Sequence, residues 1–207
     1  MKQIFKPQTE WLPPESFPDL SKYDEIAIDL ETKDPELKTM GSGSVTGKGN
    51  IVGIAVAVHD WAGYYPIRHE GGGNMDHGMV TRWFQDVLKT PATKIFHNAM
   101  YDVCFLRAER YKIHGTIVDT MIAGSLVDEN RFRYDLGSLG RDYVGIGKNE
   151  AVLKETADHW GVDAKSEMYK LPAMYVGEYA EQDADLTYKL WQEMKKQMYQ
   201  SRCRRYI

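Results

Sequence analysis

Alternating aliphatic and polar positions define one segment near the start of the chain. In residues 24–32, with the sequence DEIAIDLET, Ile26, Ile28 and Leu30 alternate with small or acidic residues. Side chains two positions apart on a β-strand point to the same face. The pattern therefore predicts a strand that buries its three aliphatic residues on one face and carries Asp29 and Glu31 side by side on the other.

Two neighbouring carboxylates on a strand need an explanation. Inside a protein they are costly unless another group compensates their charge. A hard divalent cation, which prefers oxygen ligands, is one such group. The alternative is a strand that ends in solvent, where the acids need no partner, and this segment alone leaves both interpretations open.

The patterning of the remaining chain predicts further strands and helices. Residues 51–58 form an apolar β-rich run, and residues 61–67 follow as its hairpin partner, which gives three early strands in an antiparallel meander. Short strands are expected at 94–97 and 117–118, and helices at 79–88, 98–106, 120–126, 134–143 and 176–200. Strands followed by interleaved strands and helices predict an α/β fold with a mixed central β-sheet flanked by helices.

The domain organisation follows from composition along the chain. Residues 1–22 are rich in proline and predict an extended segment anchored by Trp11, Leu12 and Phe17. Residues 23–200 are predicted to form one domain, and residues 201–207 a basic tail. The glycine- and serine-rich residues 41–49 lack the spacing of a phosphate-binding loop, so a flexible loop is expected there.

The last predicted helix also carries an acid on an apolar face. Tyr179, Asp183 and Leu186 follow helical spacing, which places Asp183 on the packed side and Tyr179 one turn before it. The neighbouring Glu181 and Asp185 are expected to face solvent. A buried Asp beside a Tyr can also be a purely structural hydrogen-bonded pair. Likewise, Asp102, near the start of the predicted helix 98–106, can serve only to stabilise the helix dipole.

Composition restricts the function only loosely. The net charge is −4 and 27% of the residues are charged, so the chain as a whole is not a basic nucleic-acid binder. An acidic site that holds cations can still bind a polyanion. Cys104 and Cys203 lie outside any zinc-binding pattern and favour a reducing compartment. Neither a signal sequence nor a membrane-spanning apolar run is present, so a cytoplasmic protein without membrane association is predicted.

Three stretches together resemble a known family. Residues 28–32 (IDLET), 97–102 (HNAMYD) and 179–185 (YAEQDAD) resemble the three motifs of the DEDDy 3′–5′ exonucleases, which are DnaQ-like members of the RNase H-like superfamily. The similarity covers roughly residues 23–200 and is strongest to the proofreading domain of family A DNA polymerases of the polymerase I and phage type. Residues 119–121 and 133–139 also resemble intervening segments of that family. The residue five positions before Asp183 is Glu178, so the chain does not match the histidine subclass.

The resemblance implies a metal-dependent 3′–5′ exonuclease with an RNase H-like fold. Such an enzyme hydrolyses the 3′ end of single-stranded DNA to 5′-mononucleotides by a two-metal mechanism, with Mg²⁺ or Mn²⁺ as the two divalent cations. It proofreads for a phage or bacterial polymerase, present as a domain or a subunit. The implied catalytic residues are Asp29, Glu31, Asp102, Tyr179 and Asp183, the implied metal ligands are the four carboxylates among them, and the implied substrate contacts are Thr32, Asn98, Tyr101 and Arg133.

Some details depart from the family pattern, and other functions remain open. Met100 stands where relatives often have Lys, and His97 where they often have Gln, which affects strand binding rather than the metal site. An exoribonuclease of the RNase D type carries the same motifs, and no residue pattern here reads the 2′-hydroxyl of RNA. A catalytically silent strand-binding module is a further alternative. The expected location is the cytoplasm of a bacterial or virus-infected cell.

Overall fold

A five-stranded mixed sheet organises the chain. The structure is a computed structural model that describes residues 9–200, so the first eight residues and the predicted basic tail 201–207 lie outside the described residues. The strand order is β3-β2-β1-β4-β5. The central strand β1 (Glu25–Lys33) pairs antiparallel with β2 (Asn50–Val58) and parallel with β4 (Thr93–Phe96), while β3 (Trp61–Pro66) and β5 (Ile117–Asp119) form the two edges. The predicted α/β class and the antiparallel meander are confirmed.

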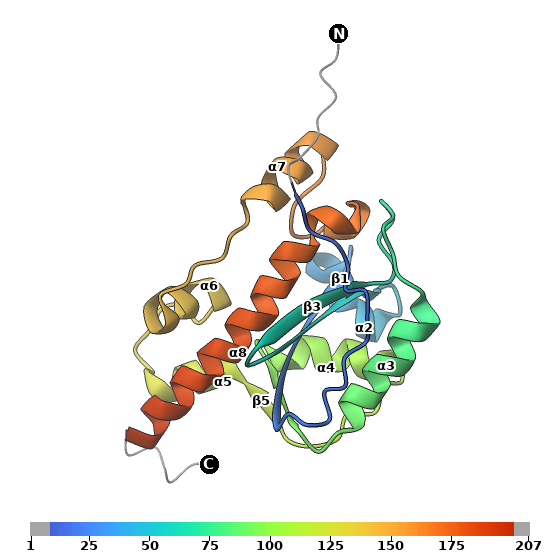
Figure 1. Cartoon of the computed structure of the whole chain (residues 1–207). Helices are drawn as coiled ribbons and strands as arrows, with labels where there is room; N and C mark the ends of the chain where they lie inside the picture. Colours follow the sequence, from blue (N-terminus) through green and yellow to red (C-terminus); the bar gives the residue numbers. More distant parts are fainter. Residues whose placement is uncertain (1–8, 201–207) are drawn as a thin grey trace.

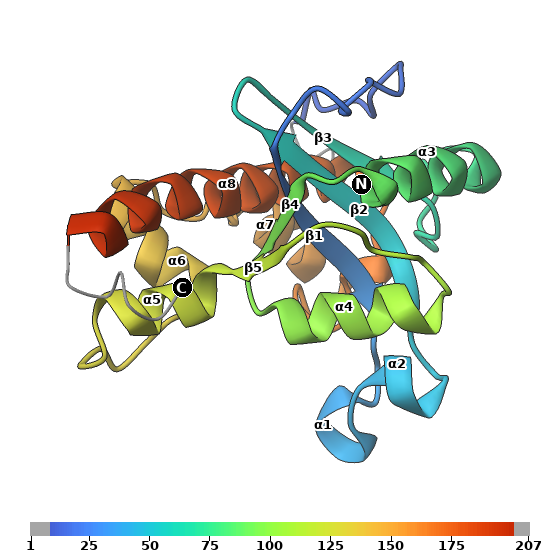
Figure 2. The ribbon, with the colours of Figure 1, turned by 90° about the horizontal axis from the view of Figure 1, so that it is seen from below.

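Helices cover both faces of this sheet (Figures 1 and 2). Helices α3 (His77–Lys89) and α4 (Ala99–Ala108) lie on one face, and the long helix α8 (Gly177–Gln200) crosses the other. Ile26, Ile28 and Leu30 belong to the core on the side of α3 and α4, whereas Ala27 belongs to the core under α8. The alternation in β1 therefore directs Asp29 and Glu31 toward the α8 side, as the sequence pattern predicts.

A smaller group of helices packs on the C-terminal half of α8. Helices α5 (Thr120–Val127) and α6 (Leu136–Leu139) and the π-helical turn η1 (Gly140–Val144) share a core with Leu186, Leu190 and Met194 of α8. Figure 2 shows this group beside the end of α8, away from the sheet. Although α8 has 24 residues, no helix within residues 9–200 is long and apolar enough to cross a membrane.

The remaining helices are short. They are α1 (Leu37–Met40), α2 (Gly43–Thr46), α7 (Ala151–Trp160) and the 3₁₀ turns η2 (Met168–Lys170) and η3 (Ala173–Tyr175). The prediction of an unstructured loop at 41–49 was wrong in part, because α2 forms within it. The backbone N–H of Gly43 donates to Asp34 Oδ1 at 2.9 Å, and the Ser42 hydroxyl caps the turn by accepting from the N–H of Ser44.

The N-terminal segment, described from residue 9, contains neither helix nor strand up to residue 22 and carries two anchors. The ring of Trp11 lies against Tyr64 with the centroids 5.9 Å apart, and Phe17 stacks on Tyr65 at 5.5 Å. The prediction that Leu12 is a third anchor was wrong, since its exposed fraction is 77%. Trp11 packs inward against Tyr64, and the side chain of its neighbour Leu12 faces solvent.

Candidate active site

Four acidic side chains from three elements lie within electrostatic reach of one another where β1, α4 and α8 meet. Asp29 and Glu31 project from β1, Asp102 from the first turn of α4, and Asp183 from α8. Strand β4 pairs with β1 only along Glu25 to Ala27, so the later N–H groups on that edge of β1 are open. Asp102 Oδ1 accepts one of them, from Leu30, at 3.1 Å. This hydrogen bond holds Asp102 at the residue of β1 that lies between Asp29 and Glu31. Asp102 therefore does more than stabilise the dipole of α4.

Burial and mutual repulsion both act on these carboxyl groups. Asp102 and Asp183 are buried, and Asp29 and Glu31 are half-buried. Burial raises the pKa of all four carboxyl groups. The charge of Asp183 further raises the pKa of Asp29, and the charges of Asp29 and Asp183 do the same for Glu31. Asp29 also raises the pKa of Asp102. The acids therefore repel one another, and a cation among them would relieve that repulsion.

Tyr179 and Asp183 lie together on α8 as predicted, and a third residue joins them. Lys148 Nζ donates to Asp183 Oδ2 at 2.5 Å and to the Tyr179 hydroxyl at 3.1 Å. Burial, followed by the charges of Asp183 and Glu31, raises the pKa of Tyr179 far above its usual value. Tyr179 is therefore a neutral phenol at physiological pH. It can orient a water molecule through a hydrogen bond but does not act as a base in its ionised form.

The predicted substrate contacts are distributed over two places. The hydroxyls of Thr32 and Tyr101 are hydrogen bonded at 2.8 Å, and the Tyr101 hydroxyl donates to Asp34 Oδ2 at 3.0 Å. Asn98 precedes α4 with an exposed side chain and a left-handed backbone conformation at φ 65°. Arg133 lies on the loop between α5 and α6, where its Nε donates to Asp135 Oδ2 at 3.0 Å.

A buried tyrosine–histidine pair stands behind the acids and was not anticipated. The Tyr64 hydroxyl is 2.7 Å from His69 Nε2, and His69 Nδ1 is 2.9 Å from the carbonyl oxygen of Leu171. Since only Nδ1–H can donate to that carbonyl, Nε2 accepts from Tyr64. A Cβ at Gly53, opposite Glu31 in the sheet, would fall 1.9 Å from the Tyr64 hydroxyl. The small residue in an otherwise aliphatic strand was the signal that a side chain approaches closely.

Whether the acids fit a divalent cation can be judged from their chemistry. All four supply carboxylate oxygens, the ligands that Mg²⁺ and Mn²⁺ prefer. Asp183 Oδ1 is buried without a hydrogen-bond partner in the described part of the chain, so one ligand oxygen is unused. As the side chains stand, no three His, Cys, Asp or Glu residues within 9–200 are grouped so that they could hold an ion. Lys148, on Asp183, provides the positive charge in this arrangement.

The raised carboxyl pKa values predict how the metal-free protein responds to pH. For Asp29 the pKa is raised from 3.8 to about 7. The folded state therefore binds more protons than the unfolded state between these values, and the stability from this group is lost as pH rises through them. With chelator present, the melting temperature of wild type should fall more than that of Asp29→Asn between about pH 5 and about pH 7.5. Each kcal/mol of difference in the free energy of unfolding corresponds to about 2–4 °C in melting temperature. Equal losses in thermal melts of the two proteins would contradict this.

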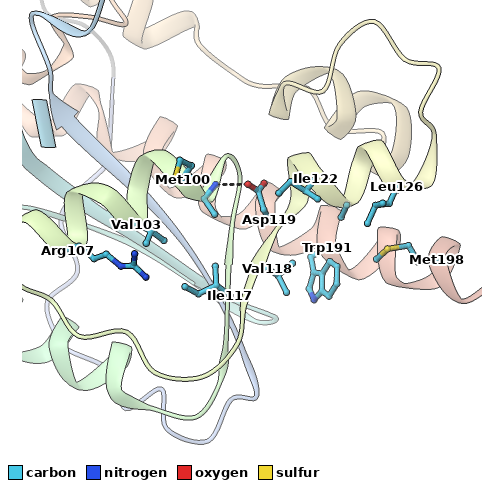
Figure 3. Close-up of a pocket in the computed structure, with 12 residues that line it drawn as sticks. Met100, Val103, Arg107, Ile117, Val118, Asp119, Ile122, Leu126, Trp191 and Met198 are labelled. Carbon is cyan, nitrogen blue, oxygen red and sulfur yellow. Dashed lines mark hydrogen bonds between the residues drawn. The ribbon is translucent and has the colours of Figure 1, made fainter. Parts of the chain in front are cut away.

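An apolar hollow of about 490 Å³ lies on another side of α4 (Figure 3). Residues of α4, β5, α5 and α8 line it, among them Met100, Ile122 and Trp191, and none of the four acids does. At its edge the Asp119 carboxylate accepts the N–H groups of Ala99 at 2.9 Å and of Asn98 at 3.0 Å. Asp119 also caps α5 by accepting from the N–H of Met121, so a single carboxylate links α5 to the start of the helix that carries Asp102.

The sequence is similar to known proteins over most of its length. A family model described as 3′-5′ exonuclease matches residues 5–199. A DNA-directed DNA polymerase of Pseudomonas phage M6 is 32% identical over 197 residues, which is 92% of this chain and 30% of the polymerase. DNA polymerase I of Pseudomonas aeruginosa is 28% identical over 182 residues, covering 82% of this chain and 18% of that protein. The chain thus spans less than a third of the length of these relatives.

Solved structures share the fold. Brucella melitensis NrnC superposes with a TM-score of 0.62 at 19% identity, covering 88% of this chain and 77% of that one. NrnC with bound Mg²⁺ gives a TM-score of 0.59 at 17% identity over 88% of this chain and 77% of that chain. Escherichia coli RNase D, an exoribonuclease, gives 0.55 at 15% identity over 86% of this chain and 40% of that one. The likeness places the sheet and its helices in the RNase H-like exonuclease fold.

Proposed function

The chain belongs to the 3′–5′ exonuclease family found in family A DNA polymerases, and on that premise we propose that it removes nucleotides from the 3′ end of single-stranded DNA. The observation that supports the proposal is that the charges of Asp29, Glu31, Asp102 and Asp183, which come from distant parts of the chain, influence one another, and that Asp29, Glu31 and Asp183 also act on the phenol of Tyr179. Carboxylates repel a phosphodiester by themselves, so their gathering suits a substrate that is bound through cations.

In the proposed reaction a water oxygen attacks phosphorus and the bond from phosphorus to the 3′ oxygen breaks. Two divalent cations, when bound by the four carboxylates, would neutralise the phosphate and lower the pKa of the attacking water. Tyr179, held as a neutral phenol, orients that water through its hydroxyl. The attacking water loses a proton, the released 3′ oxygen takes one up to become a hydroxyl, and the products are a 5′-mononucleotide and a strand shortened by one nucleotide.

Strand binding is proposed for the residues around the start of α4. The Thr32 and Tyr101 hydroxyls and the exposed amide of Asn98 offer hydrogen bonds to a sugar–phosphate backbone. Met100, with an exposed fraction of 75%, presents an apolar surface on the same helix against which a base can pack. Arg133 is proposed as a phosphate contact from the loop between α5 and α6.

The proposed biological role is proofreading beside a polymerase. The relatives that match most of this chain are DNA polymerases of which the match covers 30% or less. A proofreading exonuclease acts on a 3′ end that a polymerase presents to it. We therefore propose a family A polymerase, as a further domain or a separate subunit, as the partner.

The test is digestion of single-stranded DNA labelled at the 5′ or at the 3′ end. With Mg²⁺ or Mn²⁺, 5′-labelled DNA should give a ladder that shortens stepwise, and 3′-labelled DNA should release labelled mononucleotide at once. Chelator or the Asp29→Ala variant should abolish both. If 3′-labelled DNA instead gave a ladder of fragments shortened stepwise from the 5′ end, the proposed polarity would be contradicted. RNA of the same sequence is the second substrate, and faster digestion of RNA than of DNA would favour the exoribonuclease alternative.

A further inference from the structure

Lys148 is placed at the acidic cluster by a loop that follows η1. The loop runs from Gly145 to Glu150, between η1 and α7. The side chain of Lys148 is only 21% exposed, and its Nζ contacts both Asp183 Oδ2 and the Tyr179 hydroxyl. It thus reaches two of the five residues to which the proposed function assigns catalysis.

The backbone on both sides of Lys148 is attached to α8. Gln182 Oε1 accepts the N–H of Asn149 at 2.8 Å, and Gln182 Nε2 donates to the carbonyl oxygen of Gly147 at 3.4 Å. The stem of Lys148 also passes Gly137, where an added Cβ would lie 3.5 Å from its Cγ. Since Gln182 directly precedes Asp183, the loop position and the acid it serves are fixed by the same turn of helix. The hydrogen bonds of Gln182 therefore hold Lys148 and Asp183 in position to form their ion pair.

The position of this ammonium group conflicts with a cation on Asp183. One oxygen of Asp183 is occupied by Lys148 and the other is buried without a partner in the described part of the chain. A divalent cation bound to the same carboxylate would lie within a few ångströms of Nζ, where two positive charges repel strongly at low dielectric.

We propose that Lys148 is the resident counter-ion of the carboxylate cluster, which holds Asp183 in the metal-free protein and is displaced from it when a divalent cation binds. The inference rests on the cation site of the proposed function. It assigns Lys148 a positioning role in which its ammonium group keeps the acids together before metal arrives. The same group lowers the apparent affinity for metal, because its release from Asp183 must accompany binding.

The test is calorimetric Mn²⁺ titration of wild type, Lys148→Met and Lys148→Arg, together with thermal melts in chelator. Met keeps the length of the side chain without its charge. Lys148→Met should bind Mn²⁺ at least fivefold more tightly than wild type and should melt at a lower temperature without metal. Lys148→Arg should resemble wild type in both. Lys189→Met is the matched control, since Lys189 Nζ also lies 2.5 Å from an Asp of α8, the partly exposed Asp185.

Other outcomes have distinct meanings. If wild type binds Mn²⁺ and Lys148→Met binds it less than fivefold more tightly, the counter-ion proposal is overturned while the proposed function stands. If wild type binds no Mn²⁺, the proposed cation site itself fails. A second measurement needs no variant: amine labelling of wild type followed by mass spectrometry should show Lys148 becoming more reactive on addition of Mn²⁺, with Lys189 unchanged. Unchanged or reduced labelling of Lys148 would also overturn the proposal.

Discussion

Asp183→Asn is expected to lower kcat for single-stranded DNA by about 10³-fold, equivalent to about 4 kcal/mol of transition-state stabilisation. The amide keeps the size of the side chain but loses the negative charge that a cation needs. The charge is also the partner of Lys148, whose Nζ lies 2.5 Å from Asp183 Oδ2. The substitution therefore removes a ligand and leaves the positive charge of Lys148 facing the place where a second cation would bind.

The control for this variant is Asp185→Asn. Asp185 is two residues away on α8, but it points to another side of the helix and pairs with Lys189 at 2.5 Å. Its substitution should change kcat by less than about twofold, because an exposed pair contributes little. Rates are measured under single-turnover conditions with saturating Mg²⁺, and folding is checked by thermal melts. Similar rates for the two variants would show that Asp183 is not a ligand.

Tyr179→Phe is expected to lower kcat by about 10- to 100-fold, the range for a lost positioning contact. The phenol is neutral, so its loss removes a hydrogen bond to water and not a base. We therefore expect the pH profile of kcat to keep its shape and Mn²⁺ affinity to change little. A variant that flattens the pH profile would instead identify Tyr179 as the titrating base.

Tyr188→Phe serves as the control for this substitution. Tyr188 lies on the same helix, is half-buried, and packs in the core between α8 and the sheet rather than at the acids. Removing its hydroxyl should leave kcat within about twofold of wild type, the range of an uninvolved side chain. If both variants lose activity equally, the effect comes from the packing of α8 and not from the site.

Much of this fold and part of the site follow from local patterns. The period-two alternation of β1 is enough to place Ile28 and Leu30 in one core and Asp29 on the opposite face. The helical spacing in α8 likewise predicts that Leu186 is buried, which it is at 1% exposure, and that Asp183 shares its side. Both patterns depend on neighbours within a few residues, and local periodicity reports these reliably.

Local patterns could not predict the positions of residues that are held by distant parts of the chain. Lys148 lies in a loop without periodicity. The backbone of this loop is held by hydrogen bonds to Gln182, 34 positions further along the sequence. Glu181 was predicted to face solvent, but this was wrong. Its Oε1 accepts the N–H of Tyr64 at 3.0 Å, because the start of α8 lies along the open edge of β3. A helical wheel contains no information about which strand edge runs beside it.

The alternation in β1 also has a consequence for how this chain can fail. Asp29 stands opposite Ala55 and Leu30 opposite Ile54. A slip of one position between the two strands would exchange the two faces of β1, placing the acids in the apolar core on the side of α3 and α4 and the aliphatic side chains on the side of α8. The same pairing register of β1 thus determines both the packing of the hydrophobic core and the position of Asp29 and Glu31. A molecule of this sequence that acquires its compact core has, by the same event, aligned its acids, so misassembled but folded copies should be scarce.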